Sequence, residues 1–196
     1  MKIINKEALT QITTVRPELV EGLIHIAQTE KLAAQVGKAL GERGLMLVTA
    51  ESCTGGGLGY AITSVAGSSE WFDRGFITYT DIAKQEMLGV SATTLQQYGA
   101  VAEKTAQEMA AGALAKSHAQ VSVAITGIAG PGGATAQKPV GMVCFAWATK
   151  NANAEGLARS HTQHFSGDRQ AVRQQSIAVA LKGVLDLLGD GGVEIA

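Results

Sequence analysis

Leu45-Met46-Leu47-Val48-Thr49 is followed directly by Ala50-Glu51-Ser52-Cys53-Thr54-Gly55-Gly56-Gly57-Leu58-Gly59. The first five residues have the aliphatic, β-branched character of a buried strand. Glycine costs about 1 kcal/mol relative to alanine inside a helix, so a helix that opens with several glycines indicates that some group approaches its backbone closely. Free N–H groups at such a turn favour a phosphate or a developing oxyanion. The alternative is a tight strand-to-helix turn in which Ser52 only caps the helix.

The composition is that of one globular domain. The chain has 196 residues, of which 46% are hydrophobic and 17% charged, so it is not a disordered chain. The net charge of −1, without a long basic run, argues against nucleic acid as a partner. The N-terminus lacks the apolar core of a signal peptide, and the longest apolar run, residues 140–148, is too short to span a bilayer. We therefore expect a cytoplasmic protein without a membrane partner.

Strands alternate with helices along the chain, which predicts an α/β sheet covered on both faces. Strands are expected at residues 45–49, 76–79, 121–126 and 141–148, with a polar edge strand at 157–165. Helices are expected at residues 17–27, 32–44, 58–67, 80–87, 91–98, 102–114 and 168–188.

Chemically useful side chains follow three of the expected strands. Ser52 comes after the first, Tyr79 and Lys84 after the second, and Thr126 ends the third. Ligands in α/β sheets usually bind beyond the carboxyl ends of the strands, so Ser52 and Lys84 could meet there if these strands are neighbours. A serine nucleophile needs a base, and a desolvated lysine can supply one. The alternatives are a solvated surface lysine and a tyrosine that only packs.

Other candidate groups are weaker. Cys53 is an alternative nucleophile, although small buried cysteines usually belong to the core. His161 and His164 fall on opposite faces of an extended segment, and neither forms a metal-binding spacing with Cys144. No metal and no cofactor is therefore expected, and two cysteines do not make a disulfide framework.

A second glycine-rich segment lies at residues 127–133. It lacks the lysine of a phosphate-binding P-loop and does not open an obvious helix. Its glycines, Gly127 and Gly130 among them, still allow a ligand to approach the backbone closely. Arg169 and Arg173 lie four residues apart at the start of the last helix, where they could bind a phosphate. The alternative is that both are ordinary exposed arginines.

Several separated motifs together resemble a known family. In chain order they are Ala50-Glu51-Ser52-Cys53-Thr54-Gly55-Gly56, Gly67-Ser68-Ser69 with Trp71-Phe72, Thr78-Tyr79 with Ala83-Lys84, Leu88-Gly89-Val90, Tyr98-Gly99-Ala100-Val101, Thr126-Gly127-Ile128-Ala129-Gly130-Pro131 and Lys138-Pro139-Val140-Gly141. The chain resembles the nicotinamide-nucleotide amidohydrolases, the stand-alone relatives of the C-terminal domain of the competence/damage-inducible protein CinA. The resemblance covers residues 31–188. Residues 1–30 are then expected to be a partly helical N-terminal extension, and residues 189–196 a flexible tail.

The resemblance implies a single three-layer α/β/α domain with a mixed sheet. It implies hydrolysis of nicotinamide mononucleotide to nicotinate mononucleotide and ammonia by a metal-independent serine–lysine amidase. The catalytic residues would be Ser52 and Lys84, with Tyr79 nearby, and the glycine-rich turn would hold the oxyanion. The substrate-binding residues would be Thr54, Gly55, Gly56, Thr126, Gly127, Gly130, Arg169 and Arg173. The phosphate would be held by the glycine loops or by the two arginines. The expected partner is a small-molecule nucleotide, and we expect a homo-oligomer, with a dimer favoured.

One departure from the family and three alternatives remain. After Tyr79-Thr80 the family often has asparagine, whereas this chain has Asp81. A carboxylate there could raise the pKa of Lys84 and oppose its role as a base, or it could point to solvent. The alternatives are a regulatory module that binds pyridine nucleotides without turnover, a serine–lysine amidase or esterase with another small substrate, and a structural role in which the extension drives assembly.

Overall fold

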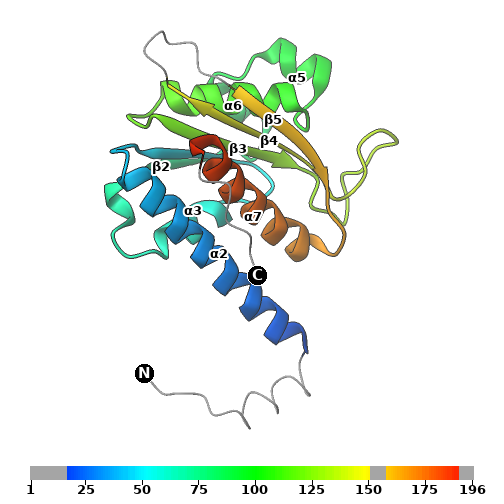
Figure 1. The fold of residues 1–196 in the computed structure, drawn as a ribbon. Coiled ribbons are helices and arrows are strands. Elements are labelled where there is room, and N and C mark those ends of the chain that lie inside the picture. The colour runs from blue at the N-terminus through cyan, green and yellow to red at the C-terminus, as the bar shows by residue number, and fades with distance from the viewer. Residues whose placement is uncertain (1–16, 151–157, 190–196) are drawn as a thin grey trace.

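The computed structural model describes residues 17–150 and 158–189. The predictions made for residues 1–16 and 190–196 lie outside the described residues. A central sheet has helices on both faces, so the predicted three-layer α/β/α architecture is confirmed (Figure 1).

The sheet is mixed, as expected. Its five strands are β1 (Leu47–Glu51), β2 (Phe72–Ile77), β3 (Val121–Gly127), β4 (Met142–Thr149) and β5 (Ala158–His164). The spatial order is β2-β1-β3-β4-β5. β1 is parallel to β2 and β3, whereas β4 is antiparallel to β3 and β5. The carboxyl ends of β1, β2 and β3 therefore meet at one edge of the sheet.

Among the described residues, three helices cover each face of the sheet. On one face lie α2 (Pro17–Gly41), α3 (Gly57–Thr63) and α7 (Arg169–Leu188), and on the other α4 (Asp81–Leu88), α5 (Ala92–Tyr98) and α6 (Glu103–Ala115). A short 3₁₀ helix, η1 (Ser68–Glu70), leads into β2. Alternate residues of the central strands supply a separate hydrophobic core to each helical layer. The helical stretches predicted at residues 17–27 and 32–44 form one continuous helix, α2.

The predicted bounds of the first two strands are wrong by several residues. β1 begins at Leu47 instead of residue 45, and β2 spans Phe72–Ile77 instead of residues 76–79. β2 is an edge strand with Asp73, Arg74 and Gly75 in its middle, so only its end has an apolar character that a sequence pattern can detect. The predicted polar edge strand at residues 157–165 is confirmed as β5.

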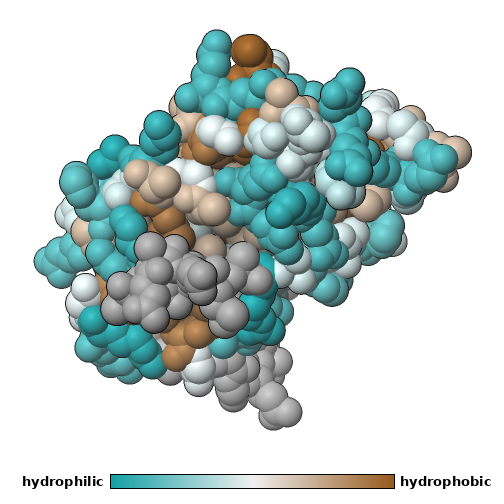
Figure 2. Space-filling view, turned by 90° about the horizontal axis from the view of Figure 1, so that it is seen from above, coloured by the Kyte–Doolittle hydropathy of each residue, from teal (hydrophilic) through white to brown (hydrophobic). Residues whose placement is uncertain are grey.

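The face seen in Figure 2 is largely hydrophilic, with hydrophobic residues in small separate groups. Elsewhere on the surface, Ile77, Tyr79 and Ile82 are large hydrophobic side chains left exposed where β2 leads into α4. No helix in the described ranges is long and apolar enough to cross a membrane.

Helix α4 packs closely against α6. A Cβ atom built on Gly112 of α6 would lie 2.0 Å from the carbonyl oxygen of Leu88, the last residue of α4. Backbone cannot yield as a flexible side chain does, so this position admits only glycine while α4 stays in place. The position of α4 matters because it carries Lys84.

We therefore expect Gly112→Ala to lower the free energy of unfolding by about 1–3 kcal/mol or more, since the added methyl must push α4 away from α6. Urea unfolding measures the change. The matched control is Gly41→Ala at the end of α2, where an added Cβ would meet nothing within 4 Å. Equal stability of the two variants would contradict the close packing.

Candidate active site

Ser52 and Lys84 meet at the edge where the parallel strands end. Lys84 Nζ donates hydrogen bonds to Ser52 Oγ at 3.2 Å and to the carbonyl oxygen of Thr78 at 2.9 Å. Ser52 is 8% exposed and Lys84 only 1%, so the amine is enclosed by protein. The structure thus places together the two residues that the sequence singled out, and Lys84 is not a surface lysine.

The local sequence directs Lys84 inward. Thr80 caps α4 by accepting a hydrogen bond from the N–H of Ala83 at 3.2 Å, which sets where the helix begins. Lys84 and Leu88 then lie four residues apart on one helix face, and both are buried.

The environment of Lys84 lowers the pKa of its amine. Desolvation by burial is the main cause, because it disfavours the charged form. The carboxylate of Asp81 acts in the opposite direction, as does the Cys53 thiolate, but the net direction remains downward. Asp81 therefore moderates the shift without reversing it, and its own side chain is exposed. A lysine with a lowered pKa is suited to accept a proton near neutral pH.

The glycine-rich turn differs from the expectation, because an acidic side chain occupies it. Glu51, the last residue of β1, is 1% exposed, and its carboxylate accepts hydrogen bonds from the N–H groups of Gly56, Leu58 and Gly59. These groups are therefore not free for a phosphate or an oxyanion, which corrects the prediction that they would hold one. In the described part of the chain, the N–H groups of Cys53 and Thr54 form no hydrogen bond with another main-chain group, and that of Cys53 contacts its own thiol.

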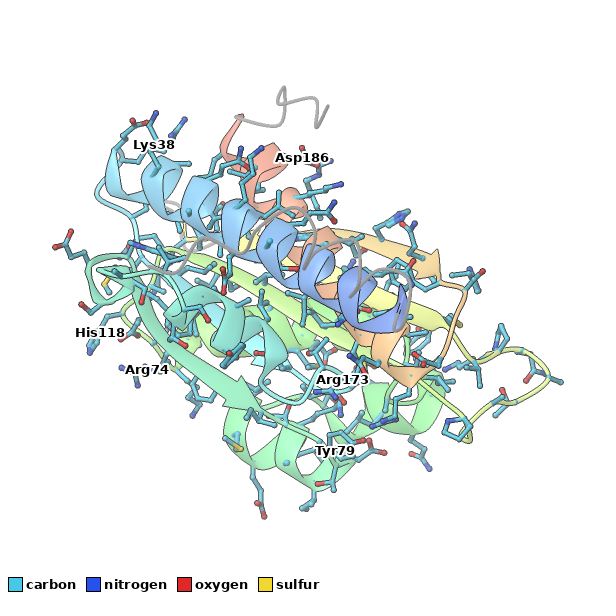
Figure 3. The ribbon with its side chains drawn as sticks, turned by 90° about the horizontal axis from the view of Figure 1, so that it is seen from below. Lys38, Arg74, Tyr79, His118, Arg173 and Asp186 are labelled. Atoms are coloured by element: carbon cyan, nitrogen blue, oxygen red, sulfur yellow. The ribbon has the colours of Figure 1, made fainter. Side chains whose placement is uncertain are left out.

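The two arginines of α7 close the site from the other helical layer. Arg173 Nη2 donates to the carbonyl oxygen of Thr54 at 2.7 Å, and its buried Nε has no partner among the described residues. Arg169 donates to the carbonyl oxygen of Gly130 at 2.7 Å and to the hydroxyl of Tyr79 at 2.9 Å. Figure 3 shows Arg173 and Tyr79 at the same end of the molecule. Both arginines line a cavity of about 500 Å³ at the start of α7, so they share a helix face as the sequence indicated.

The remaining predicted binding residues take different positions. Gly55 and Gly56 adopt left-handed backbone conformations that make the sharp turn after Ser52. Thr54 is fully buried, and its hydroxyl has no partner among the described residues. Thr126 Oγ1 donates to the carbonyl oxygen of Ala100 at 2.7 Å, so this hydroxyl holds the connection between α5 and α6. Gly127 ends β3 and packs closely against Val143 of β4.

Cys53 lies next to Ser52 but points into the hydrophobic core between the sheet and its helices. Burial is the main cause that raises the pKa of its thiol to about 11. The thiolate that a cysteine nucleophile requires is therefore scarce at neutral pH. No group of three or more potential metal ligands occurs within the residues that the structure describes.

Comparison with known proteins gives the family. The model of the CinA C-terminal domain matches residues 29–188. This chain belongs to that family. The nicotinamide-nucleotide amidohydrolase PncC of Escherichia coli K12 is 53% identical over 152 residues, covering 78% of this chain and 90% of that protein. The protein of the same name from Pseudomonas putida is 43% identical over 156 residues, covering 80% and 94%.

Solved structures of the same family share the fold. The competence/damage-inducible protein CihA of Agrobacterium tumefaciens is 44% identical, with a TM-score of 0.75 over 83% of this chain and 96% of that one. The competence damage-inducible protein A of Klebsiella pneumoniae is 38% identical, with a TM-score of 0.78 over 82% and 97%. The family expected from the motifs is therefore confirmed, and its amidase character agrees with the names of these curated relatives.

Two groups of the candidate site were not predicted from the sequence. The carbonyl oxygen of Thr78 holds Lys84, but a backbone acceptor leaves no signature in a sequence. The sequence predicts no separate role for Glu51 within its motif. Its position after a buried strand and before a run of glycines was the signal that could have drawn attention to it.

The opposing effects on Lys84 give a testable pH dependence. Neutral Lys84 should speed sulfonylation of Ser52 by phenylmethanesulfonyl fluoride, so the rate should rise with pH through the pKa of Lys84. Removing the charge of Asp81 lowers that pKa further, so we expect the midpoint in Asp81→Asn to move to lower pH. Intact-mass spectrometry over a pH series measures the rate. Glu86→Gln, which removes another exposed carboxylate of α4, is the control, and a shift to higher pH in Asp81→Asn would contradict the analysis.

Proposed function

We propose that this chain hydrolyses the carboxamide of nicotinamide mononucleotide to nicotinate mononucleotide and ammonia, with Ser52 as nucleophile and Lys84 as general base. The observation that carries the proposal is the contact of 3.2 Å between Ser52 Oγ and the buried amine of Lys84. The names of the PncC relatives support the substrate and the reaction. The nucleotide is then the small-molecule partner expected from the sequence.

Neutral Lys84 begins the reaction. The carbonyl oxygen of Thr78 accepts one of its N–H bonds, which orients the amine and leaves its lone pair for the hydroxyl proton of Ser52. Ser52 Oγ attacks the amide carbon while Lys84 takes this proton. The protonated lysine then gives the proton to the amide nitrogen, which leaves as ammonia. Water next attacks the acyl-enzyme, and its proton passes through Lys84 to the departing Ser52 Oγ. Tyr79, whose hydroxyl is held by Arg169, helps to orient the substrate.

The oxyanion is held by the backbone of the residues that follow the nucleophile. Glu51 occupies the N–H groups of Gly56, Leu58 and Gly59, but within the described ranges those of Cys53 and Thr54 are not bonded to another main-chain group. Preorganised N–H donors next to a nucleophile stabilise the charge that develops on the carbonyl oxygen.

The phosphate binds at the start of α7. The sequence left open whether the glycine loops or the two arginines hold it. The buried carboxylate of Glu51 repels an anion from the glycine turn, whereas Arg169 and Arg173 line a cavity of about 500 Å³ on α7, together with the acidic Asp168 at the start of that helix. Arg173 also donates a hydrogen bond to the carbonyl oxygen of Thr54, which connects α7 to the turn that carries Ser52.

Ammonia release from nicotinamide mononucleotide tests the catalytic pair. We expect Ser52→Ala and Lys84→Ala each to lower kcat by at least about 1,000-fold, because nucleophile and base act as a unit. Cys53→Ala is the matched control and should remain active, and a chelator should leave the wild-type rate unchanged. Binding of the nucleotide by the wild type without ammonia release would favour the regulatory-module alternative instead.

A second comparison tests the phosphate site. We expect Arg169→Ala and Arg173→Ala to raise KM for the mononucleotide by roughly 10- to 100-fold, because a hydrogen bond to a charged group is worth about 1.5–3 kcal/mol. Nicotinamide riboside, which lacks the phosphate, should show little of this change. Arg159→Ala removes an exposed arginine of β5 as a control. Equal losses for riboside and mononucleotide would place the phosphate elsewhere.

A further inference from the structure

Glu51 is a buried carboxylate to which the proposed reaction gives no chemical step. Oε2 accepts hydrogen bonds from Gly56 and Leu58 at 3.0 Å each, and Oε1 accepts one from Gly59 at 2.8 Å. Burying a carboxylate costs several kcal/mol unless hydrogen bonds or opposite charge compensate it. No lysine or arginine in the described part of the chain forms an ion pair with Glu51. Within the described residues, backbone N–H groups alone provide the compensation, which ties this side chain closely to the turn.

The turn that carries Ser52 is fixed at both ends by this one residue. At the N-terminal end of the turn, the backbone of Glu51 is paired with β2 and β3, opposite Ile77 and Ile125. At the C-terminal end of the turn, the carboxylate of Glu51 accepts a hydrogen bond from the N–H group of Gly56. The segment between them is shortened further by the hydrogen bond from Gly55 N–H to the carbonyl oxygen of Ser52 at 3.0 Å. Ser52 therefore sits in a small closed loop with few other conformations.

Glu51 is also connected to the base. Its carbonyl oxygen accepts the N–H of Thr78 at 2.8 Å, and the carbonyl oxygen of Thr78 in turn accepts a hydrogen bond from Lys84. The main chain of Glu51 thus supports the segment that orients Lys84, while its side chain supports the loop that carries Ser52. A substitution separates the two effects, because it changes only the side chain.

We propose that Glu51 is a positioning residue, whose carboxylate holds the loop after β1 so that Ser52 Oγ faces Lys84 and the N–H groups of Cys53 and Thr54 remain unbound by other main-chain groups. The inference rests on the proposed function only for the role of Ser52 as nucleophile. A residue that merely caps α3 would instead affect stability without affecting the reactivity of Ser52.

Glu51→Gln and Glu51→Asp test the proposal. Glutamine keeps the size but turns an N–H₂ group toward backbone donors, and aspartate keeps the charge but is one methylene too short. The rate of Ser52 sulfonylation by phenylmethanesulfonyl fluoride is measured by intact mass; the Ser52 Oγ–sulfur bond forms, fluoride leaves, and Lys84 takes the hydroxyl proton. We expect a loss of roughly 10- to 100-fold in this rate and in kcat, because a displacement of about 1 Å costs about that much. KM should stay within roughly threefold of the wild-type value, because a displaced Ser52 Oγ slows the reaction step and leaves substrate binding unchanged.

Glu108→Gln is the matched control. The carboxylate of Glu108 likewise holds a backbone N–H, that of Ser91 at 2.9 Å, and the hydroxyl of Thr94 at 2.6 Å, but it lies between α5 and α6. Urea unfolding of all variants shows how much stability each loses. We expect Glu108→Gln to lose stability and keep wild-type sulfonylation.

Three results would overturn the proposal: wild-type sulfonylation in Glu51→Gln, an equal loss in Glu108→Gln, or loss of cooperative unfolding in both Glu51 variants. Failure of the proposed function is a separate result. A wild-type protein that is sulfonylated at Ser52 but releases no ammonia would refute the substrate, while the sulfonylation rates still decide the role of Glu51.

Discussion

The site depends on the parallel pairing of β1 with both β2 and β3. Glu51 lies opposite Ile77 on one side and Ile125 on the other, so β1 and β2 end at the same level while β3 continues to Gly127. This register brings the loop after β1 next to the segment after β2, and with it Ser52 next to α4 and Lys84. The antiparallel strands β4 and β5 extend the sheet away from the site. The chemistry is thus concentrated at one edge of one half of the sheet.

The meeting of Ser52 and Lys84 could be predicted from the sequence, because each follows an expected strand and parallel strands end at a common edge. The layers of the fold, the final helix and the polar edge strand were likewise indicated by hydrophobic periodicity. The bounds of β2 could not be predicted, since Asp73, Arg74 and Gly75 are acceptable at an exposed sheet edge and give no strand pattern. Pairing with β1, which a single sequence does not reveal, decides where that strand begins.

The prediction that the glycine-rich turn holds an anion was wrong for the N–H groups of Gly56, Leu58 and Gly59, and the reason is physical. A run of glycines indicates that something approaches the backbone, but it does not say whether that group is a ligand or a side chain of the protein itself. Here it is the carboxylate of Glu51, which binds three N–H groups that a phosphate might otherwise have bound. The acidic residue before the serine thus makes this turn unfavourable for an anion, which is why the proposed phosphate site lies on another helix, α7.

The burial of Lys84 has a consequence for folding. An exposed lysine in the unfolded chain has its ordinary pKa of 10.5, whereas the pKa of Lys84 in the folded protein is lower. Between these two values the unfolded chain binds more protons than the folded one, so stability rises with pH across that interval. At every pH below the folded pKa the protein bears the full cost of keeping a charged amine out of water. The hydrophobic layers on both faces of the sheet must supply that much additional stability, so the reactivity of the site is maintained at the expense of the fold.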